Sequence, residues 1–306
     1  MSIMIVSQHK SINPWIESFK MFDNNIDIQI YPDITNKDDI TFALVWSKND
    51  IDFKEFKNLQ CISSMGAGVN HILDNKTILK DVSIVKIVDE KLVDSMWEYL
   101  ITVVMNVVTN HYEYMRYKNE NIWKPILPKT ISAFTIGILG LGQLGSVMAQ
   151  NFNAMNFKVK GYSQSEKELD SIDTTTNIEE FINGVDILIN LLPLTEKTQK
   201  ILNKELLLKI NNQGYLINVG RGEHLVESDL LDVIDSNHLR GATLDVFMNE
   251  PLSSIHLFWK HPNIMITPHS ASITDPNMVT KQIMLNYKRI CEGLEPLHKI
   301  NKDRGY

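Results

Sequence analysis

Three clusters of polar residues follow apolar, strand-length runs in the second half of the chain. They contain an arginine, an acid and a histidine and lie in residues 218–222, 245–251 and 267–271. The guanidinium of Arg221 can fork onto a carboxylate and polarise the carbonyl beside it. The imidazole of His269 can supply a proton, and Glu250 behind it favours the imidazolium and fixes its orientation. Together these residue types predict a site that reduces a 2-oxo acid by hydride transfer.

A glycine-rich turn follows the apolar run 134–139 and precedes a helix-like segment, residues 146–152. It reads Gly-Leu-Gly-Gln-Leu-Gly from Gly140 to Gly145. Gly140 allows a tight turn, Gly142 lets the backbone approach a pyrophosphate, and Gly145 lets the helix pack close to the strand. The N–H groups that begin the helix then face the anion. The motif predicts a dinucleotide cofactor.

The end of the next expected strand bears on which cofactor is used. In folds that prefer NAD, an acid about 20 residues beyond the glycine motif binds the adenosine ribose. This chain has Ser163, Gln164 and Ser165 there, so no negative charge opposes a 2′-phosphate. Lys167 can also donate to a phosphate, whereas Glu166 opposes one. We expect NADP(H) to be favoured, with NAD(H) as the alternative.

The elements that position these residues indicate an α/β protein with parallel sheets. Eleven short apolar runs predict strands, at residues 4–7, 28–31, 42–46, 60–63, 83–88, 134–139, 158–162, 186–190, 215–219, 242–246 and 264–267. Their spacing predicts two doubly wound domains, a Rossmann cofactor domain with six strands and a smaller, flavodoxin-like substrate domain. Ligands bind at the carboxyl ends of such strands, where the polar clusters lie.

Two longer segments predict the domain boundaries. Residues 94–117 form an apolar-periodic stretch without proline or glycine, which predicts one long helix. Residues 271–290 have helical character and can return the chain to the first domain. We therefore expect a substrate domain of residues 1–95 and 275–306, and a dinucleotide-binding domain of residues 96–274.

Composition limits the classes of partner. The chain has 306 residues and a formal net charge of −7, and its basic residues are scattered. Nucleic acid is an unexpected partner because no basic stripe is present to neutralise phosphates. The spacing of Cys61 and Cys291 indicates neither a disulfide framework nor a metal site. Since the sequence has no secretion signal and no bilayer-spanning apolar run, we expect a cytoplasmic protein without a membrane partner.

The order of these motifs resembles the D-isomer-specific 2-hydroxyacid dehydrogenases, in particular the glyoxylate/hydroxypyruvate reductase A type. Further passages carry the same resemblance, at residues 43–46, 64–69, 96–99, 191–193 and 304–306. The similarity covers nearly the whole chain. It implies reduction of glyoxylate or hydroxypyruvate to glycolate or D-glycerate, and it implies a homodimer.

The resemblance also implies residue roles. Arg221 binds the substrate carboxylate and carbonyl, Glu250 supports His269, and His269 is the general acid. The implied substrate contacts are Trp46 as a pocket wall and backbone N–H groups of Met65, Gly66, Ala67 and Gly68. The implied cofactor contacts, with Asp245 on the nicotinamide amide, are Gly140, Gly142, Gln143, Leu144, Gly145, Ser163, Gln164, Ser165, Leu192, Pro193, Val219, Gly220 and Asp245. Family members usually have arginine where Gln164 stands, and a guanidinium holds a phosphate better than an amide.

Other interpretations stay open. Most histidines in proteins are structural, and we assign that role to His111, His224, His238, His256, His261 and His298. Trp46 can belong to the core, and residues 65–68 can be a plain connection between a strand and a helix. The rival functions are a nucleotide-sensing binding protein on a dehydrogenase scaffold and a reductase of a bulkier 2-oxo acid.

Overall fold

The computed structural model of the chain describes residues 1–7, 11–46, 50–66 and 68–302. Its contacts divide the chain into two compact units. Unit 1 comprises Met1–Leu92 and Ile273–Tyr306, and unit 2 comprises Val93–Ser272. The expected assignment of substrate binding to one unit and cofactor binding to the other stays a prediction.

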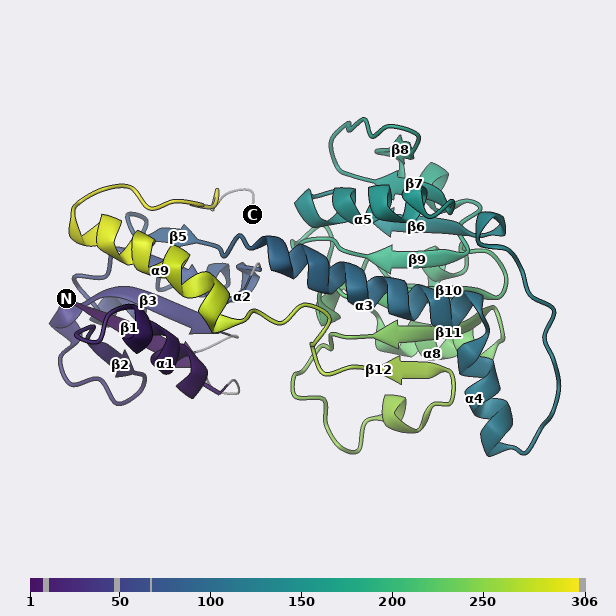
Figure 1. Cartoon of the computed structure of the whole chain (residues 1–306), viewed down its shortest axis with the longest axis horizontal. Helices are drawn as coiled ribbons and strands as arrows, with labels where there is room; N and C mark the ends of the chain where they lie inside the picture. Colours follow the sequence, from purple (N-terminus) through teal and green to yellow (C-terminus); the bar gives the residue numbers. More distant parts are fainter. Residues whose placement is uncertain (8–10, 47–49, 67, 303–306) are drawn as a thin grey trace. The chain divides into compact units, whose positions relative to one another are not determined.

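Unit 1 contains a five-stranded sheet in the order β2-β1-β3-β4-β5 (Figure 1). Its strands are β1 (Ser2–Ser7), β2 (Ile28–Ile30), β3 (Ile40–Trp46), β4 (Cys61–Ser64) and β5 (Ser83–Val85). All neighbouring strands are parallel. This strand order is the flavodoxin-like arrangement.

The two faces of this sheet are covered by different segments. Helices α1 (Asn13–Phe22) and α9 (Pro276–Cys291) pack against one face, over side chains such as Ile5 and Leu44. Residues near the short helix α2 (Asn70–Leu73) cover the other face. The expected start of the last helix at residue 271 is wrong, because α9 begins at Pro276, after Asp275 accepts a hydrogen bond from the N–H of Asn277.

Unit 2 contains a seven-stranded sheet in the order β12-β11-β10-β9-β6-β7-β8, again with every pair parallel. Its strands are β6 (Thr135–Leu139), β7 (Lys158–Tyr162), β8 (Asp173–Thr175), β9 (Ile187–Asn190), β10 (Gly214–Asn218), β11 (Leu239–Leu244) and β12 (Ile264–Ile266). The α/β class with two parallel sheets is confirmed. The expectation of six strands in this unit is wrong, because β8 is short and polar and has no apolar run to predict it.

Helices cover both faces of the seven-stranded sheet (Figure 1). They are α3 (Glu90–Val108), α4 (His111–Asn119), α5 (Gln143–Ala154), α6 (Ile178–Ile182), α7 (Lys204–Leu207) and α8 (Glu227–Asp235). Residues of α3 from Met96 onward and of α5 share one core cluster with Ile136 and Ile217. Helices α6, α7 and α8 share the other cluster with Leu188 and Leu216. The alternation of side chains along buried strands thus places a core on each face.

The expected single helix over residues 94–117 is wrong. Helix α3 ends at Val108, and Asn110 adopts a left-handed conformation with φ of 58° before α4 begins. Asparagine tolerates this conformation better than most residues. Arg240 of β11 donates to the carbonyl of Val107 at 2.9 Å and so caps the end of α3. Among the described residues, no single helix is long and apolar enough to cross a membrane.

Candidate active site

The glycine-rich turn lies where the strand order of unit 2 reverses. Strand β6 pairs with β7 on one side and with β9 on the other, which makes its carboxyl end a topological switch point. Gly140 has φ of 114°, and a Cβ there would lie 3.0 Å from the backbone of Leu191 and Leu192 beyond β9. Gly145 packs against the turn, because a Cβ on it would lie 1.9 Å from the Gly140 oxygen.

The approach to the start of α5 is open. A Cβ built on Gly142 meets nothing within 4 Å. The first hydrogen bond of the helix runs from the N–H of Ser146 to the Gly142 carbonyl at 3.0 Å, so the N–H groups of Gln143, Leu144 and Gly145 precede it. Such an end favours an anion. The turn therefore fits the pyrophosphate of a dinucleotide, and the contact itself stays a prediction.

The segment after β7 carries the residues expected to select the cofactor. Gln164 and Ser165 are exposed, and the Ser163 hydroxyl donates to the Ser165 carbonyl at 2.5 Å. Lys167 reaches back to the glycine-rich turn, where its ammonium donates to the Leu141 carbonyl and, at 3.1 Å, to the Ser146 hydroxyl. The ammonium of Lys167 thus lies beside the turn, whereas position 164, where the resemblance implies an arginine, carries Gln164.

An imidazole and a carboxylate form a pair beyond β11 and β12. Nδ1 of His269 lies 2.7 Å from Oε2 of Glu250, so the Nδ1–H donates to the carboxylate and the hydrogen bond orients the ring. Oε1 of Glu250 accepts a hydrogen bond from the N–H of Phe247 at 3.0 Å. The side chains of His269 and Glu250 are 30% and 36% exposed, which keeps the pair accessible to a reactant.

Glu250 is a carboxylate at neutral pH. Burial raises its pKa, but the hydrogen bond and charge of His269, the N–H of Phe247 and the charge of Arg221 together outweigh burial. The pKa of Glu250 therefore lies below its ordinary value. The carboxylate therefore accepts the Nδ1–H hydrogen bond of His269 and fixes the orientation of the imidazole.

Arg221 follows β10 and lies within electrostatic range of this pair. Burial lowers the pKa of Arg221 below its ordinary value, and the charges of Glu250 and Glu223 oppose that shift. The guanidinium remains charged at neutral pH. Its Nη1 donates to the Gly220 carbonyl at 2.6 Å. A Cβ on Gly222 would lie 1.9 Å from the carbonyl carbon of Phe247, so the two loops meet backbone to backbone. This contact brings Arg221 and Glu250 together.

Asp245 is tied to the loop that carries His269. The residue is 1% exposed, and its carboxylate accepts hydrogen bonds from the N–H groups of Ser270 at 2.8 Å and Ala271 at 3.0 Å. The N–H of His269, whose φ of 51° is left-handed, donates to the Asp245 carbonyl at 2.8 Å. This strained conformation needs such support. Asp245 therefore holds the His269 loop, and a contact with nicotinamide stays a prediction.

Two hydroxyl groups connect Asp245 to α3 through hydrogen bonds. The Thr267 hydroxyl donates to Oδ1 of Asp245 at 2.5 Å and lies 2.7 Å from the Tyr99 hydroxyl. Burial raises the pKa of Tyr99 well above its ordinary value, so the phenol stays protonated. Thr267 and Tyr99 were not predicted as supporting residues, because nothing in their spacing relates α3 to the end of β12.

A second set of buried polar residues holds the arginine turn. Asn190 ends β9 and Asn218 ends β10, and both are fully buried. The Asn190 amide donates to Oδ1 of Asn218 at 2.9 Å, while the Asn218 amide donates to the Arg221 carbonyl at 3.2 Å. The supporting role of these asparagines was not predicted, although Asn218 belongs to the polar cluster 218–222. The sequence signal that could have indicated this role is that a polar residue ends each of two otherwise apolar runs.

The expected substrate residues of unit 1 are placed as follows. Trp46 ends β3 and is partly buried, and a Cβ on Gly66 would lie 3.1 Å from its ring. The N–H of Met65 donates to the Val45 carbonyl at 3.0 Å, and the N–H of Gly66 donates to the Ser64 hydroxyl at 3.1 Å. These two N–H groups already have acceptors, which argues against their binding a carboxylate. Gly68 remains a candidate, and Ala67 and residues 304–306 lie outside the described residues.

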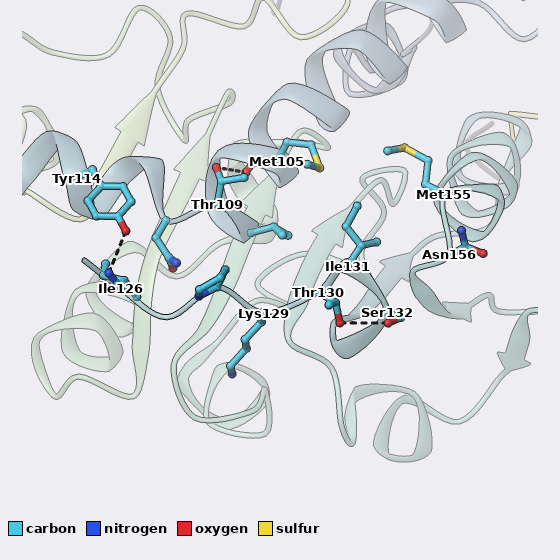
Figure 2. Close-up of a pocket in the computed structure, with 13 residues that line it drawn as sticks. Met105, Thr109, Tyr114, Ile126, Lys129, Thr130, Ile131, Ser132, Met155 and Asn156 are labelled. Carbon is cyan, nitrogen blue, oxygen red and sulfur yellow. Dashed lines mark hydrogen bonds between the residues drawn. The ribbon is translucent and has the colours of Figure 1, made fainter. Parts of the chain in front are cut away.

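A hollow elsewhere on unit 2 contains none of these residues (Figure 2). It has a volume of about 690 Å³ and lies among the end of α3, the start of α4, the end of α5 and residues 126–132. The hydroxyl of Tyr114 accepts a hydrogen bond from the N–H of Ile126 at 3.0 Å at its margin. The described residues that line it include no carboxylate or imidazole, so it lacks the groups for the predicted chemistry.

Comparisons with known proteins show the family of the chain. Residues 101–271 match the family model for the NAD-binding domain of D-isomer-specific 2-hydroxyacid dehydrogenases. The chain is 36% identical over 273 residues to glyoxylate/hydroxypyruvate reductase A of Yersinia enterocolitica. It is 37% identical over 273 residues to the protein of that name from Serratia proteamaculans. Each alignment covers 87% of both chains.

Two solved structures are similar over the full length. The D-isomer-specific 2-hydroxyacid dehydrogenase of Xanthobacter autotrophicus, in complex with NADPH and MES, has a TM-score of 0.90 and 29% identity, covering 100% of this chain and 99% of that one. The NADPH-dependent glyoxylate/hydroxypyruvate reductase of Sinorhizobium meliloti, in complex with NADP and sulfate, has a TM-score of 0.90 and 31% identity, covering 100% of both chains.

Proposed function

Because the chain belongs to the D-isomer-specific 2-hydroxyacid dehydrogenase family, we propose that it reduces glyoxylate or hydroxypyruvate to glycolate or D-glycerate. The observation that carries the proposal is the His269–Glu250 pair, 2.7 Å between Nδ1 and Oε2, next to the loop of Arg221. This arrangement supplies a proton donor and a fixed cation to one small carbonyl substrate. The relatives that carry the reductase name add independent support.

Each of the three side chains has a distinct task in the proposed reaction. The guanidinium of Arg221 binds the substrate carboxylate and polarises the adjacent carbonyl. Nε2 of His269 donates the proton that the carbonyl oxygen takes up. Glu250 accepts the Nδ1–H hydrogen bond and thereby keeps Nε2 directed to the substrate side. A nicotinamide cofactor, when bound, supplies the hydride.

We assign cofactor binding to the carboxyl edge of the seven-stranded sheet. The start of α5, with Gly142 open to solvent, is proposed to hold the pyrophosphate. Leu192, Pro193, Val219 and Gly220, which follow β9 and β10, are proposed to line the rest of the path. NADPH is the favoured reductant, because no acid occupies positions 163–165 and Lys167 supplies a cation. The NADPH and NADP complexes of the similar structures support this preference.

For the substrate, we propose contacts with Trp46 and Gly68 in addition to Arg221. Trp46 is partly buried at the end of β3 and offers a rigid aromatic surface. Replacement of Trp46 by alanine tests this role. We expect a raised KM for hydroxypyruvate with an unchanged Kd for NADPH, and an unchanged KM would remove Trp46 from the substrate site.

An absorbance assay tests the function directly. The purified chain is mixed with NADPH or NADH and with glyoxylate, hydroxypyruvate, pyruvate and a branched 2-oxo acid. We expect the largest kcat/KM with glyoxylate or hydroxypyruvate as the acid and NADPH as the reductant. Binding of NADPH without turnover of any acid would instead indicate a nucleotide-sensing binding protein. Turnover of the branched acid alone would indicate a reductase of bulkier substrates.

We also propose that the protein is a cytoplasmic homodimer. Trp123 and Leu127 are 100% and 91% exposed, and Leu127 lies in sequence between Ile126 and Pro128, which line the hollow. An exposed apolar surface of this kind fits a second copy of the chain. Cys61 and Cys291 are free thiols, which suits a reducing compartment. Light scattering after gel filtration should give twice the chain mass for the wild type. The double variant Trp123→Ser, Leu127→Ser should give the mass of a monomer. A monomeric wild type would contradict the dimer.

A further inference from the structure

His224 lies directly behind the arginine turn and is fully buried. Its Nδ1 is 3.1 Å from the backbone nitrogen of Arg221 and 2.9 Å from Nδ2 of Asn190. Both neighbours are N–H donors, so Nδ1 must accept and carries no proton. The ring proton is therefore on Nε2, which lies 3.4 Å from the Pro193 carbonyl.

The ring of His224 is also neutral. Burial lowers the pKa of His224 to about 4, the Pro193 carbonyl acts in the raising direction, and the charge of Arg221 lowers the pKa further. At neutral pH this imidazole therefore does not compete with His269 as a proton donor. What it contributes to the turn is an acceptor in a place that water does not reach.

The backbone of Arg221 is held from two sides. Its N–H donates to His224, and its carbonyl accepts from the amide of Asn218 at 3.2 Å. Gly220 lets the chain pass close to these side chains, because a Cβ there would lie 2.7 Å from Nδ2 of Asn190 and 3.0 Å from Nδ1 of His224. The direction in which the guanidinium leaves the turn depends on this fixed backbone.

We propose that His224 is a positioning residue for Arg221: its unprotonated Nδ1 fixes the main chain of the turn and thereby the fork that binds the substrate carboxylate. The kinetic consequence rests on the proposed function, whereas the hydrogen-bond geometry does not. An apolar side chain of similar size would leave two buried N–H groups without an acceptor. The residue acts through Arg221 and does not touch the reacting atoms.

Two substitutions separate positioning from bulk. His224→Leu keeps a buried side chain and removes the acceptor, whereas His224→Asn can place Oδ1 where Nδ1 lies. For His224→Leu we expect KM for hydroxypyruvate to rise about 10- to 100-fold, with the Kd for NADPH within about twofold of wild type. His224→Asn should restore KM to within about threefold. Loss of NADPH binding together with a raised KM in both variants would overturn the proposal, because the two changes together would indicate general damage to the fold.

His238→Leu is the matched control. His238 is a partly buried histidine of the same unit, bonded through Nε2 to the Ile210 carbonyl at 2.9 Å, and it lies before β11, away from the Arg221 turn. We expect this variant to lose stability without a change in KM. An equal rise in KM in His238→Leu and His224→Leu would overturn the positioning role.

A spectroscopic measurement on the wild type keeps the proposal testable if His224→Leu does not fold. Nitrogen NMR of the imidazole should show an unprotonated Nδ1 and a protonated Nε2 for His224, constant between pH 6 and 8. The amide of Arg221 should be protected from hydrogen exchange. A protonated Nδ1 or an unprotected Arg221 amide would refute the inference. Absence of 2-oxo acid reduction by the wild type, with this NMR signature present, would refute the proposed function alone.

Discussion

At the scale of single residues, the groups proposed to react are distinct from the groups that hold them. His269 and Glu250 are about one-third exposed, while Asp245 and Asn218 are almost completely buried. Asp245 accepts hydrogen bonds from the loop that carries His269, and Asn218 donates one to the loop that carries Arg221. A reactive side chain must meet its substrate, and its supports must be kept from water so that the geometry stays fixed.

Replacing Arg221 with lysine should impair substrate binding although the charge is kept. An ammonium lacks the planar fork that engages a carboxylate through two parallel hydrogen bonds. We expect KM for hydroxypyruvate to rise about 10- to 100-fold, with little change in the Kd for NADPH. Steady-state kinetics and fluorescence titration measure the two quantities. Arg116→Lys, at a surface ion pair with Glu120, is the control; a wild-type KM in Arg221→Lys would remove the fork from the account.

Replacing Lys167 with alanine should weaken NADPH selectively. The ammonium lies beside the Ser146 hydroxyl and is the basic group that we propose for the extra phosphate of NADPH. Its loss should raise the Kd for NADPH about tenfold, or about 1.4 kcal/mol, and leave the Kd for NADH unchanged. Calorimetry with both nucleotides checks this. The control is Lys158→Ala, at an exposed position of β7, which should change neither Kd. If Lys167→Ala raised the Kd values for NADPH and NADH equally, the ammonium would not bind the 2′-phosphate.

At the scale of elements, the site is built from strand ends and the loops that follow them. The turn after β6 meets the backbone beyond β9, and the turn after β10 meets the loop beyond β11. These contacts between backbones leave no room for side chains at Gly140, Gly145 and Gly222. The glycine pattern could be read in the sequence because each of these requirements excludes every other residue type.

Two glycines of the same turn should respond differently to alanine. A Cβ at Gly142 meets nothing within 4 Å, whereas one at Gly145 would lie 1.9 Å from the Gly140 oxygen. Gly142→Ala should leave the urea midpoint nearly unchanged and raise the Kd for NADPH at least tenfold, because the methyl group occupies the approach of the pyrophosphate. Gly145→Ala should lower stability by about 1–3 kcal/mol through overpacking. Wild-type NADPH affinity in Gly142→Ala would contradict the proposed path of the cofactor.

The turn that holds Arg221 contains His224, which should make the free energy of unfolding depend on pH. The pKa of His224 is lowered to about 4, against about 6.5 in an unfolded chain, so only the unfolded chain binds this proton between those values. The stabilisation is complete above pH 6.5 and is lost as the pH falls toward 4. Between pH 7 and pH 5 the wild type should lose about 2 kcal/mol more than His224→Asn. Urea unfolding at both pH values measures it, and equal losses would show that His224 does not titrate in this way.

At the scale of the whole molecule, the sequence predicted the fold class and the family, and both are confirmed. Buried parallel strands give continuous apolar runs, and those runs were readable. Strand β8 was not predicted because its three residues are polar, and the break at Asn110 was missed because it depends on Arg240, 130 residues away in sequence. The partners of Asp245, Asn190 and His224 were unreadable for the same reason: hydrogen bonds between loops leave no periodic pattern in the chain.

The most direct test of the central claim compares wild type with His269→Gln in hydroxypyruvate reduction, with NADPH affinity measured on the same samples. Glutamine keeps a polar side chain but cannot deliver the proton. The account predicts that kcat falls about 10²- to 10⁴-fold while the Kd for NADPH stays within about twofold, and that the product of the wild type is D-glycerate. Unchanged turnover in His269→Gln would contradict it.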